Sequence, residues 1–189
     1  MGRKMRIIVG ITGASGSIYG YTLIRALHQL GIETHLIATE MGVKVMQFEC
    51  GMKIEDLKEY AIIHHNKNLF ASVASGSFKT DGMVIVPCSM NSLGAIANGV
   101  GDTLLSRAAS VVMKERRNLV IVPREAPFHL IHLKNMTTLA ESGVSILPAS
   151  PGFYHLPTEI WELVNFMVAR ILDALNIEHE LIERWGERK

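Results

Sequence analysis

Cysteine is scarce in this chain of 189 residues, which contains only Cys50 and Cys88. The two lie far apart in the sequence and form neither a CxxC pair nor a zinc-ligand spacing, so the expected compartment is a reducing one, the cytoplasm. Long apolar runs are also absent. No run reaches the roughly 18 residues that a membrane span needs, and residues 7–11 are too few and too glycine-rich for a signal peptide.

An excess of either charge is lacking too, since 19 basic and 18 acidic residues leave a net charge of +1. This balance gives no broad basic surface for nucleic acid and no acidic tail, so any bound anion must be held by a local site. Hydrophobic residues make up 48% and charged residues 20% of the chain, which excludes full disorder. The length predicts one domain over residues 1–189.

Apolar, β-branched runs alternate with stretches of helical periodicity along the chain. Strands are expected over residues 6–11, 33–38, 82–86, 118–122 and 144–147. Helices are expected over residues 18–30, 40–50, 92–97, 104–115, 132–141 and 158–175, with Thr158 as the cap of the last one. Strands buried on both faces and separated by helices predict an α/β fold, a Rossmann-like parallel sheet with helices on both faces.

Open parallel sheets bind ligands beyond the carboxyl ends of their strands, so the turns that follow the strands form the candidate site. The first turn, GITGASGS at residues 10–17, has glycines that let the backbone approach a phosphate next to a helix N-terminus. Its spacing fits neither GxGxxG nor a P-loop. It is either a phosphate or cofactor cradle or a tight turn in which Ser15 or Ser17 caps the helix.

The turn after the third expected strand, PCSMNS at residues 87–92, offers small hydroxyls and an amide. Pro87 is expected to end the strand. The polar groups after it either bind phosphate oxygens or a polar ring edge, or they simply cap a helix start. Cys88 is interpreted as a small buried hydrophobe, because no histidine is obviously arranged to activate its thiol.

A charged pair follows the fourth expected strand in PREAP, residues 123–127. Arg124 can clamp a phosphate with two hydrogen bonds, and Glu125 can serve as an acid or base if burial raises its pKa. The alternative is a salt bridge between the two at the sheet rim. Upstream, Arg107 and Lys114 are seven residues apart and share one helix face, which suits either an anionic ligand or a surface stripe.

Arg116 and Arg117 are interpreted as a solvated helix end. After the fifth expected strand, three prolines in PASPGFYHLP (148–157) hold Tyr154 rigid, either as a ligand wall or in a surface lid. Arg170 lies within the last helix, where it can simply extend to solvent. The eight histidines include no HExxH motif and no third ligand beside His129 and His132, so no metal site is expected.

Eight segments carry the motifs of one family. They are TGASGSIYG (12–20), ASGSF (74–78), PCSMNSL (87–93), LLSRAASVVMKERRNLVIVPREAPF (104–128), IHLKNM (131–136), LPASPGFYHLP (147–157), VARIL (168–172) and RWGE (184–187). Together they resemble the UbiX family, flavin prenyltransferases once described as aromatic acid decarboxylases. The resemblance extends over nearly the whole chain.

The resemblance implies a flavoprotein fold of the flavodoxin-like, HFCD type, with FMN at the carboxyl edge of the sheet between subunits. The implied flavin-binding residues are Gly13, Ala14, Ser15, Thr39, Ser89, Met90, Asn91, Ser92 and Arg124. The implied residues for the dimethylallyl donor are Ser75, Arg107, Lys114, Glu125, Tyr154, Arg170 and Trp185. The implied catalytic residues are Ser15, Glu49, Lys114 and Glu125.

The implied reaction is metal-free transfer of a dimethylallyl group from dimethylallyl phosphate or diphosphate to reduced FMN, at N5 and then at C6. Cationic side chains would hold the leaving phosphate in place of magnesium, and Glu125 would protonate it. The resemblance also implies a homo-oligomer, a dodecamer, whose prenylated FMN passes to a UbiD-type decarboxylase. One position departs from the family, since Leu69 stands where some members have Trp.

Other functions are open on the sequence alone. A flavin-dependent cysteine decarboxylase shares this fold and has a PASANT-type turn that residues 87–92 resemble. Its His-Ile-x-Leu motif is missing, because His64 and His65 are followed by Asn66 and Lys67. A carrier that only binds FMN for a partner decarboxylase is a further possibility. Direct decarboxylation of aromatic acids is weaker, because no residue set supplies an electron sink without a modified cofactor.

Overall fold

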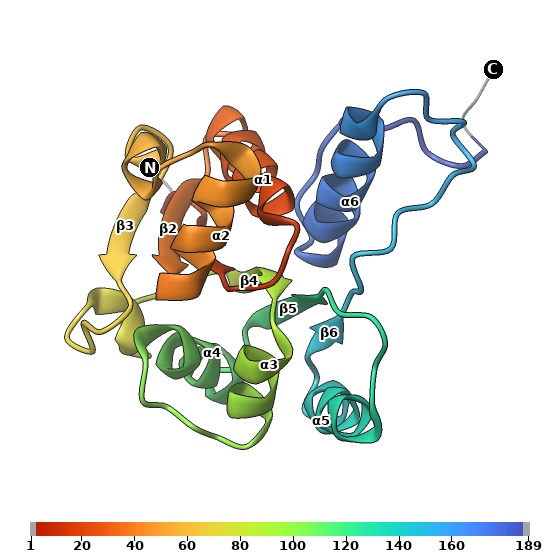
Figure 1. Cartoon of the computed structure of the whole chain (residues 1–189). Helices are drawn as coiled ribbons and strands as arrows, with labels where there is room; N and C mark the ends of the chain where they lie inside the picture. Colours follow the sequence, from red (N-terminus) through yellow and green to blue (C-terminus); the bar gives the residue numbers. More distant parts are fainter. Residues whose placement is uncertain (1–2, 187–189) are drawn as a thin grey trace.

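Six parallel strands form the sheet in the computed structural model, which describes residues 3–186 (Figure 1). They are β1 (Arg6–Ile11), β2 (Glu33–Ala38), β3 (Ile62–His65), β4 (Gly82–Cys88), β5 (Asn118–Pro123) and β6 (Ser145–Ile146). The sheet order is β3-β2-β1-β4-β5-β6, with β1 and β4 at the centre. The order reverses at this central pair, and open α/β sheets bind ligands beyond the carboxyl ends of the strands at such a reversal. Glu187, the last residue of the RWGE motif, lies outside the described residues.

Helices cover both faces of the sheet (Figure 1). On one face lie α1 (Ser17–Gln29), α2 (Glu40–Cys50) and α6 (Ile160–Ala174), and on the other α3 (Met90–Ala97), α4 (Leu104–Lys114) and α5 (Leu130–Glu141). The short 3-10 helices η1 (Ile54–Leu57) and η2 (Ser72–Ala74) precede β3 and β4. Within residues 3–186 no helix is long and apolar enough to cross a membrane. The predicted parallel sheet with helices on both faces is confirmed.

Each face has its own apolar core, because successive residues of a strand point to opposite faces. In β4, Val84 and Val86 belong to the core shared with α1 and α6, whereas Met83 and Ile85 belong to the core shared with α3 and α4. All four are fully buried. Burying such a side chain contributes about 1.5–3 kcal/mol, so the two cores together hold the central strands firmly. The turns at the ends of these strands are therefore well placed to build a site.

Two strand predictions need correction. The strand β3 is missing from the sequence prediction, because IIHH at the sheet edge is half exposed and gives no buried apolar run. The prediction that Pro87 ends its strand is wrong, since β4 continues to Cys88. The register of β4 against β5 shifts between Ile85 and Cys88, and such an irregularity accommodates a proline, which has no N–H for the sheet.

Three helix starts differ from the predictions by two residues, and α1 begins one residue earlier than predicted. The helix α3 begins at Met90 with Ser89 as its cap, and α5 begins at Leu130 with His129 as its cap. The prediction that Thr158 caps α6 is wrong. Glu159 occupies the cap position, and the N–H and hydroxyl of Thr158 instead donate to Glu162 Oε2 at 2.6 and 3.2 Å.

Two glycines draw helices against the ends of the central strands. A Cβ atom on Gly20 in α1 would lie 2.6 Å from the Val86 carbonyl oxygen, and one on Gly42 in α2 would lie 2.6 Å from the Ile11 carbonyl oxygen. Real Cβ atoms do not approach backbone this closely. Glycine at these positions therefore lets α1 and α2 reach the carboxyl ends of β1 and β4, where the predicted site residues lie.

Candidate active site

The turns after β1 and β4 lie side by side at the carboxyl edge of the sheet. The buried Thr12 joins them, because its hydroxyl donates to the Pro87 carbonyl oxygen at 2.9 Å and accepts from the Ser89 N–H at 2.7 Å. The turns carry most of what we call the carboxyl-edge group, defined as Gly13, Ala14, Ser15, Thr39, Glu49, Ser89, Met90, Asn91, Ser92, Arg124 and Glu125.

Several hydrogen-bond donors of this group have no partner among residues 3–186. The backbone N–H groups of Gly13, Ala14 and Ser15 make no hydrogen bond there, and neither do those of Met90 and Asn91 at the start of α3. Free N–H groups at a helix start and in a glycine-rich turn favour negatively polarised oxygen atoms. The two central turns therefore present donors to a ligand from two sides.

Glu49 belongs to α2, and its carboxylate accepts hydrogen bonds at the N-terminus of α1. Its Oε2 accepts from the N–H groups of Gly16 and Ser17 at 2.9 and 3.0 Å. Burial raises the pKa of Glu49, but hydrogen bonds from the Ser15 side chain and from these two N–H groups outweigh burial and lower it below its ordinary value. The interpretation of Ser15 or Ser17 as the cap of α1 is wrong. Gly16 occupies that position with a φ of 103°, and Glu49 supplies the acceptor.

The caps of α2 and α3 come from two predicted flavin residues. Thr39 Oγ1 accepts from the Gly42 N–H at 3.0 Å, and Ser89 Oγ accepts from the Ser92 N–H at 3.3 Å. Ser89 therefore caps a helix, as one interpretation of the PCSMNS turn expects, and it also lies at the candidate binding site, as the other expects. Cys88 is fully buried, and burial raises its pKa to about 12. The thiol is therefore protonated at neutral pH, as expected for a packing residue.

Arg124 and Glu125 follow β5 at the same edge. The Nε of Arg124 is buried and has no hydrogen-bond partner among the described residues. The alternative of a salt bridge between the two is contradicted, because Glu125 is exposed and its Oε1 accepts from the Ala126 N–H at 3.0 Å. The described chain holds no ion pair between them. Arg124 thus keeps its donor available for a ligand.

Three predicted residues lie on and beside α4, and we call them the α4 group: Ser75, Arg107 and Lys114. Arg107 Nε donates to the Ala74 carbonyl oxygen at 3.4 Å, and a Cβ atom on Gly76 would lie 2.9 Å from Lys114 Nζ. Ser75 Oγ and Ser77 Oγ share a hydrogen bond of 2.9 Å. The structure therefore brings these two exposed cations and the ASGSF segment to one side of the molecule.

Arg117 anchors the same segment, and its role was missed in the sequence. Its guanidinium donates to the carbonyl oxygens of Gly76 and Phe78 at 2.6 and 3.0 Å and to Thr80 Oγ1 at 3.2 Å. The interpretation of Arg117 as a solvated helix end is wrong, whereas Arg116 is exposed as expected. The carbonyl partners of Arg117 lie about forty residues earlier in the sequence, so only the folded chain reveals them.

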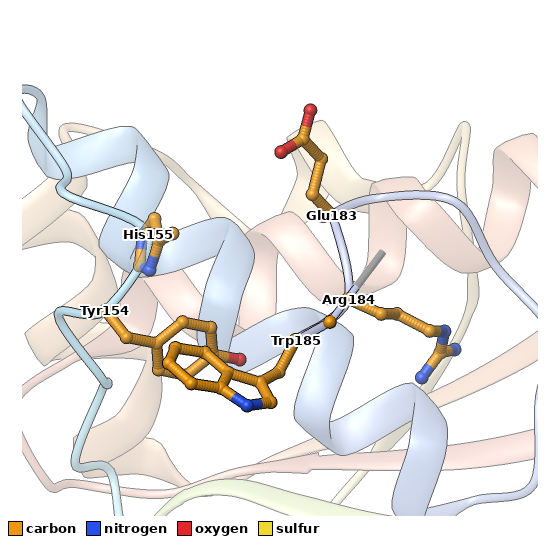
Figure 2. A pocket seen from close by; sticks show the side chains of 6 residues that line it. Tyr154, His155, Glu183, Arg184 and Trp185 are labelled. Atoms are coloured by element: carbon orange, nitrogen blue, oxygen red, sulfur yellow. The ribbon is translucent and has the colours of Figure 1, made fainter. Parts of the chain in front are cut away.

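Tyr154, Arg170 and Trp185 form what we call the α6 group. The rings of Tyr154 and Trp185 meet edge to face with centroids 5.1 Å apart, and Figure 2 shows them against each other. They line a cavity of about 460 Å³ together with His155, Glu183, Arg184 and Gly186. Tyr154 also packs on Phe166, one turn of α6 before Arg170, whose Nη1 pairs with Asp173 Oδ2 at 2.7 Å.

Lys114 and the carboxyl-edge group lie at opposite ends of the sheet. Lys114 ends α4 just before β5 begins at Asn118, whereas Glu125 follows the other end of β5. A six-residue strand spans about 20 Å, so both side chains cannot touch one phosphate of a single copy. Arg170 is also near the amino end, because Ala174 at the end of α6 accepts from Asn118 Nδ2 at 2.6 Å. The predicted residues thus form three separate groups in one chain.

Comparison with known proteins decides the family. Residues 1–172 match the Flavoprotein family. The flavin prenyltransferase UbiX of Thermoplasma acidophilum is 47% identical over 182 residues, which cover 96% of this chain and 100% of the relative. This chain belongs to the UbiX family.

Two solved structures of UbiX proteins have the same fold. AnUbiX (PadA1), determined in complex with FMN and dimethylallyl pyrophosphate, superimposes with a TM-score of 0.96 at 39% identity, covering 99% of this chain and 100% of the other. The dodecameric FMN-dependent UbiX-like decarboxylase from Escherichia coli O157:H7 superimposes with a TM-score of 0.94 at 41% identity, covering 96% and 100%. The fold predicted from the family resemblance is therefore confirmed.

The carboxyl edge of this UbiX family member fits a flavin nucleotide. FMN presents a phosphate and the carbonyl oxygens of its ring system, and the edge offers unpaired N–H groups on two turns and the unpaired Nε of Arg124. Hydroxyls of Ser15, Thr39, Ser89 and Ser92 add small polar groups without charge. No group of three or more His, Cys, Asp or Glu side chains within residues 3–186 is suited to hold a metal ion.

Proposed function

We propose that this protein is a flavin prenyltransferase. It joins a dimethylallyl group from dimethylallyl phosphate or diphosphate to N5 and C6 of reduced FMN. The observation that carries the proposal is the gathering of unpaired donors on the turns after β1, β4 and β5, at the reversal of the sheet order. The AnUbiX complex with FMN and dimethylallyl pyrophosphate, at a TM-score of 0.96, supports it.

FMN is held at the carboxyl edge. The residues that bind it are Gly13, Ala14, Ser15, Thr39, Ser89, Met90, Asn91, Ser92 and Arg124. Backbone N–H groups and the Arg124 guanidinium take its oxygen atoms. Glycine at position 13 keeps the first turn close to α2, since a Cβ atom there would lie 2.7 Å from the Met41 Cβ. Reduced FMN supplies the electron-rich ring that accepts the prenyl carbons.

The donor is bound through its phosphate. Arg107, Lys114 and Arg170 supply positive charge and Ser75 a hydroxyl, which together take the place that magnesium has in ordinary prenyltransferases. The bond between the allylic carbon and the phosphate oxygen breaks with its electron pair on the phosphate. Glu125 gives that phosphate a proton, which neutralises charge that develops on the oxygen as the bond breaks.

Aromatic side chains face the allylic carbon as positive charge develops on it. Tyr154 and Trp185, which already contact each other, offer π faces that stabilise a cation by about 0.5–2 kcal/mol per contact. They offer no strong nucleophile that would compete for the prenyl group. Glu49 keeps the Ser15 turn in place through the hydrogen bonds described above.

Other copies of the chain complete the site. Lys114 and Glu125 stand about 20 Å apart along β5 in one copy, so we infer that Lys114 of one copy meets Glu125 of another. A closed symmetric oligomer repeats such a contact at every site. We infer a dodecamer, which the dodecameric E. coli relative supports.

The product, prenylated FMN, has a modified ring that a decarboxylase of the UbiD type uses as its electron sink. We therefore place the protein in the cytoplasm, upstream of such a decarboxylase. Its two free cysteines, Cys50 and Cys88, suit a reducing compartment. A metal ion is not required, because the cationic side chains named above neutralise the leaving phosphate.

The test is anaerobic incubation of the purified protein with reduced FMN and either dimethylallyl monophosphate or dimethylallyl diphosphate, followed by mass spectrometry of the released flavin. We expect a flavin that carries one additional five-carbon unit. Leu69 is 45% exposed in the loop after β3. The donor that reacts faster shows whether a chain with Leu69 at this position prefers the monophosphate or the diphosphate. Unmodified flavin with both donors despite FMN binding would favour the carrier or the cysteine decarboxylase instead.

A further inference from the structure

Thr12 stands between the two central turns but belongs to none of the three sets of predicted site residues. It is fully buried, with an exposed fraction of 0%. Regular pairing between β1 and β4 stops at Gly10 and Ile85. Thr12 lies just past this point, where the chain leaves β1 for the first flavin turn.

Thr12 takes part in three hydrogen bonds beyond this pair, two as the donor and one as the acceptor. The Thr12 N–H donates to the Pro87 carbonyl oxygen at 3.2 Å, and the Thr12 hydroxyl donates to the same oxygen at 2.9 Å. The hydroxyl also accepts from the Ser89 N–H at 2.7 Å. The buried Thr12 hydroxyl thus donates to the residue before Cys88 and accepts from the residue after it. These two bonds fix where the second turn begins.

The partner groups explain why this tie bears on the ligand. Ser89 caps α3, so its position sets the direction of the free N–H groups of Met90 and Asn91. Thr12 is followed directly by Gly13, Ala14 and Ser15, whose N–H groups are also free. The Thr12 hydroxyl therefore fixes the spacing between the two sets of donors that approach the ligand.

We propose that Thr12 is a positioning residue for FMN, acting through Ser89 and the first turn rather than by contact with the flavin. This role rests on the proposed function, because it assumes that FMN binds between the two turns. Valine has the same shape as threonine without the hydroxyl. In Thr12→Val the partly buried Ser89 N–H loses its acceptor, and an N–H left without a partner in such a place costs more than the lost hydrogen bond itself.

The test is titration of the full-length protein with FMN, followed by quenching of flavin fluorescence. We expect the Kd for FMN to rise about ten-fold or more in Thr12→Val and to stay within about three-fold of wild type in Thr12→Ser, which keeps the hydroxyl. Thr34→Val is the matched control. Thr34 is 2% exposed in β2, and its Oγ1 has no partner among the described residues, so the Kd should not change.

Melting temperatures without FMN separate this role from a general loss of stability. A Thr12→Val protein that melts earlier but binds FMN as tightly as wild type would overturn the proposal, and so would failure of Thr12→Ser to restore binding. If Thr12→Val does not fold, Thr12→Cys takes its place, since a thiol is a weaker donor and acceptor. It is expected to weaken FMN binding more than Thr12→Ser. Wild-type protein that does not bind FMN would overturn the proposed function itself.

Discussion

Two carboxylates at the same sheet edge have different surroundings and are given different tasks. Glu49 accepts hydrogen bonds from the N–H groups of Gly16 and Ser17, which together with Ser15 keep it ionised. Glu125 is exposed in one copy, and among residues 3–186 it accepts only from the Ala126 N–H. A carboxylate that is fixed and ionised suits a supporting role, whereas one that a second copy can cover suits proton transfer.

The Glu125→Gln variant tests the proton donor. The amide keeps the size of the side chain but cannot protonate the leaving phosphate, so the rate of prenyl transfer should fall about 100-fold or more. The Kd for FMN should stay within about three-fold of wild type, because Arg124 and the turn N–H groups are intact. Single-turnover kinetics of prenylated FMN formation measure the rate, with Glu141→Gln at the exposed end of α5 as the control. An unchanged single-turnover rate would contradict the role of Glu125.

The Glu49→Gln variant tests the anion at the start of α1. Because the pKa of Glu49 is below its ordinary value of 4.5, the folded state binds fewer protons than the unfolded state, and this contribution to stability is complete above pH 4.5. It is lost as the pH falls through the lowered pKa. At pH 7 the largely exposed side chain should contribute about 0.5–1 kcal/mol to the free energy of unfolding.

Urea unfolding at a series of pH values measures this difference between wild type and Glu49→Gln. The wild type should be the more stable protein at pH 7, and the gap should narrow as the pH is lowered below 4.5. A gap that stays constant or widens on acidification would show that Glu49 does not stabilise the start of α1 as a carboxylate.

At the scale of elements, one side chain makes three hydrogen bonds that hold residues 76–80 to the end of α4. Arg117 donates to Gly76, Phe78 and Thr80, and these bonds place Ser75 beside Arg107 and Lys114. The neighbouring Arg116 is exposed. Two adjacent arginines thus have different surroundings, and only Arg117 holds the segment.

Replacing each of these arginines with methionine separates the two roles. Arg117→Met leaves three acceptors without their partner and should lower the free energy of unfolding by about 1–3 kcal/mol. Arg116→Met should change it by less than about 0.5 kcal/mol. Urea denaturation of both variants under the same conditions gives the comparison, and equal destabilisation by the two would refute the anchoring role of Arg117.

The sequence predicts elements well where the signal is local. Buried apolar runs predict the ends of β1, β2, β4 and β5 to within two residues. Each of the turns after β1, β4 and β5 has its motif in a single short segment, so these motifs can be recognised in the sequence. The exposed edge strand β3 is not predicted from the sequence, because His64 and His65 interrupt the apolar pattern. The Glu49 contact with Gly16 and the Thr12 contact with Ser89 join residues 33 and 77 positions apart, and no local pattern contains them.

At the scale of the whole molecule, the family resemblance implies a site between subunits but does not say which residues one copy supplies. Lys114 and Glu125 are close in sequence, yet the length of β5 separates them. The parallel topology causes this, since each helix returns the chain to the amino end before the next strand. The proposed site is therefore a property of the oligomer, which one chain does not contain by itself.

Mixed oligomers test this central claim most directly. Lys114→Gln and Glu125→Gln are co-expressed as differently tagged chains, and prenylated FMN is measured by mass spectrometry under anaerobic conditions. If each site takes Lys114 from one copy and Glu125 from another, random mixing leaves about one quarter of the sites intact, and about one quarter of the wild-type rate should return. If both residues served the same site within one copy, every site would carry a defect. A rate no higher than that of the two parent variants would contradict the account.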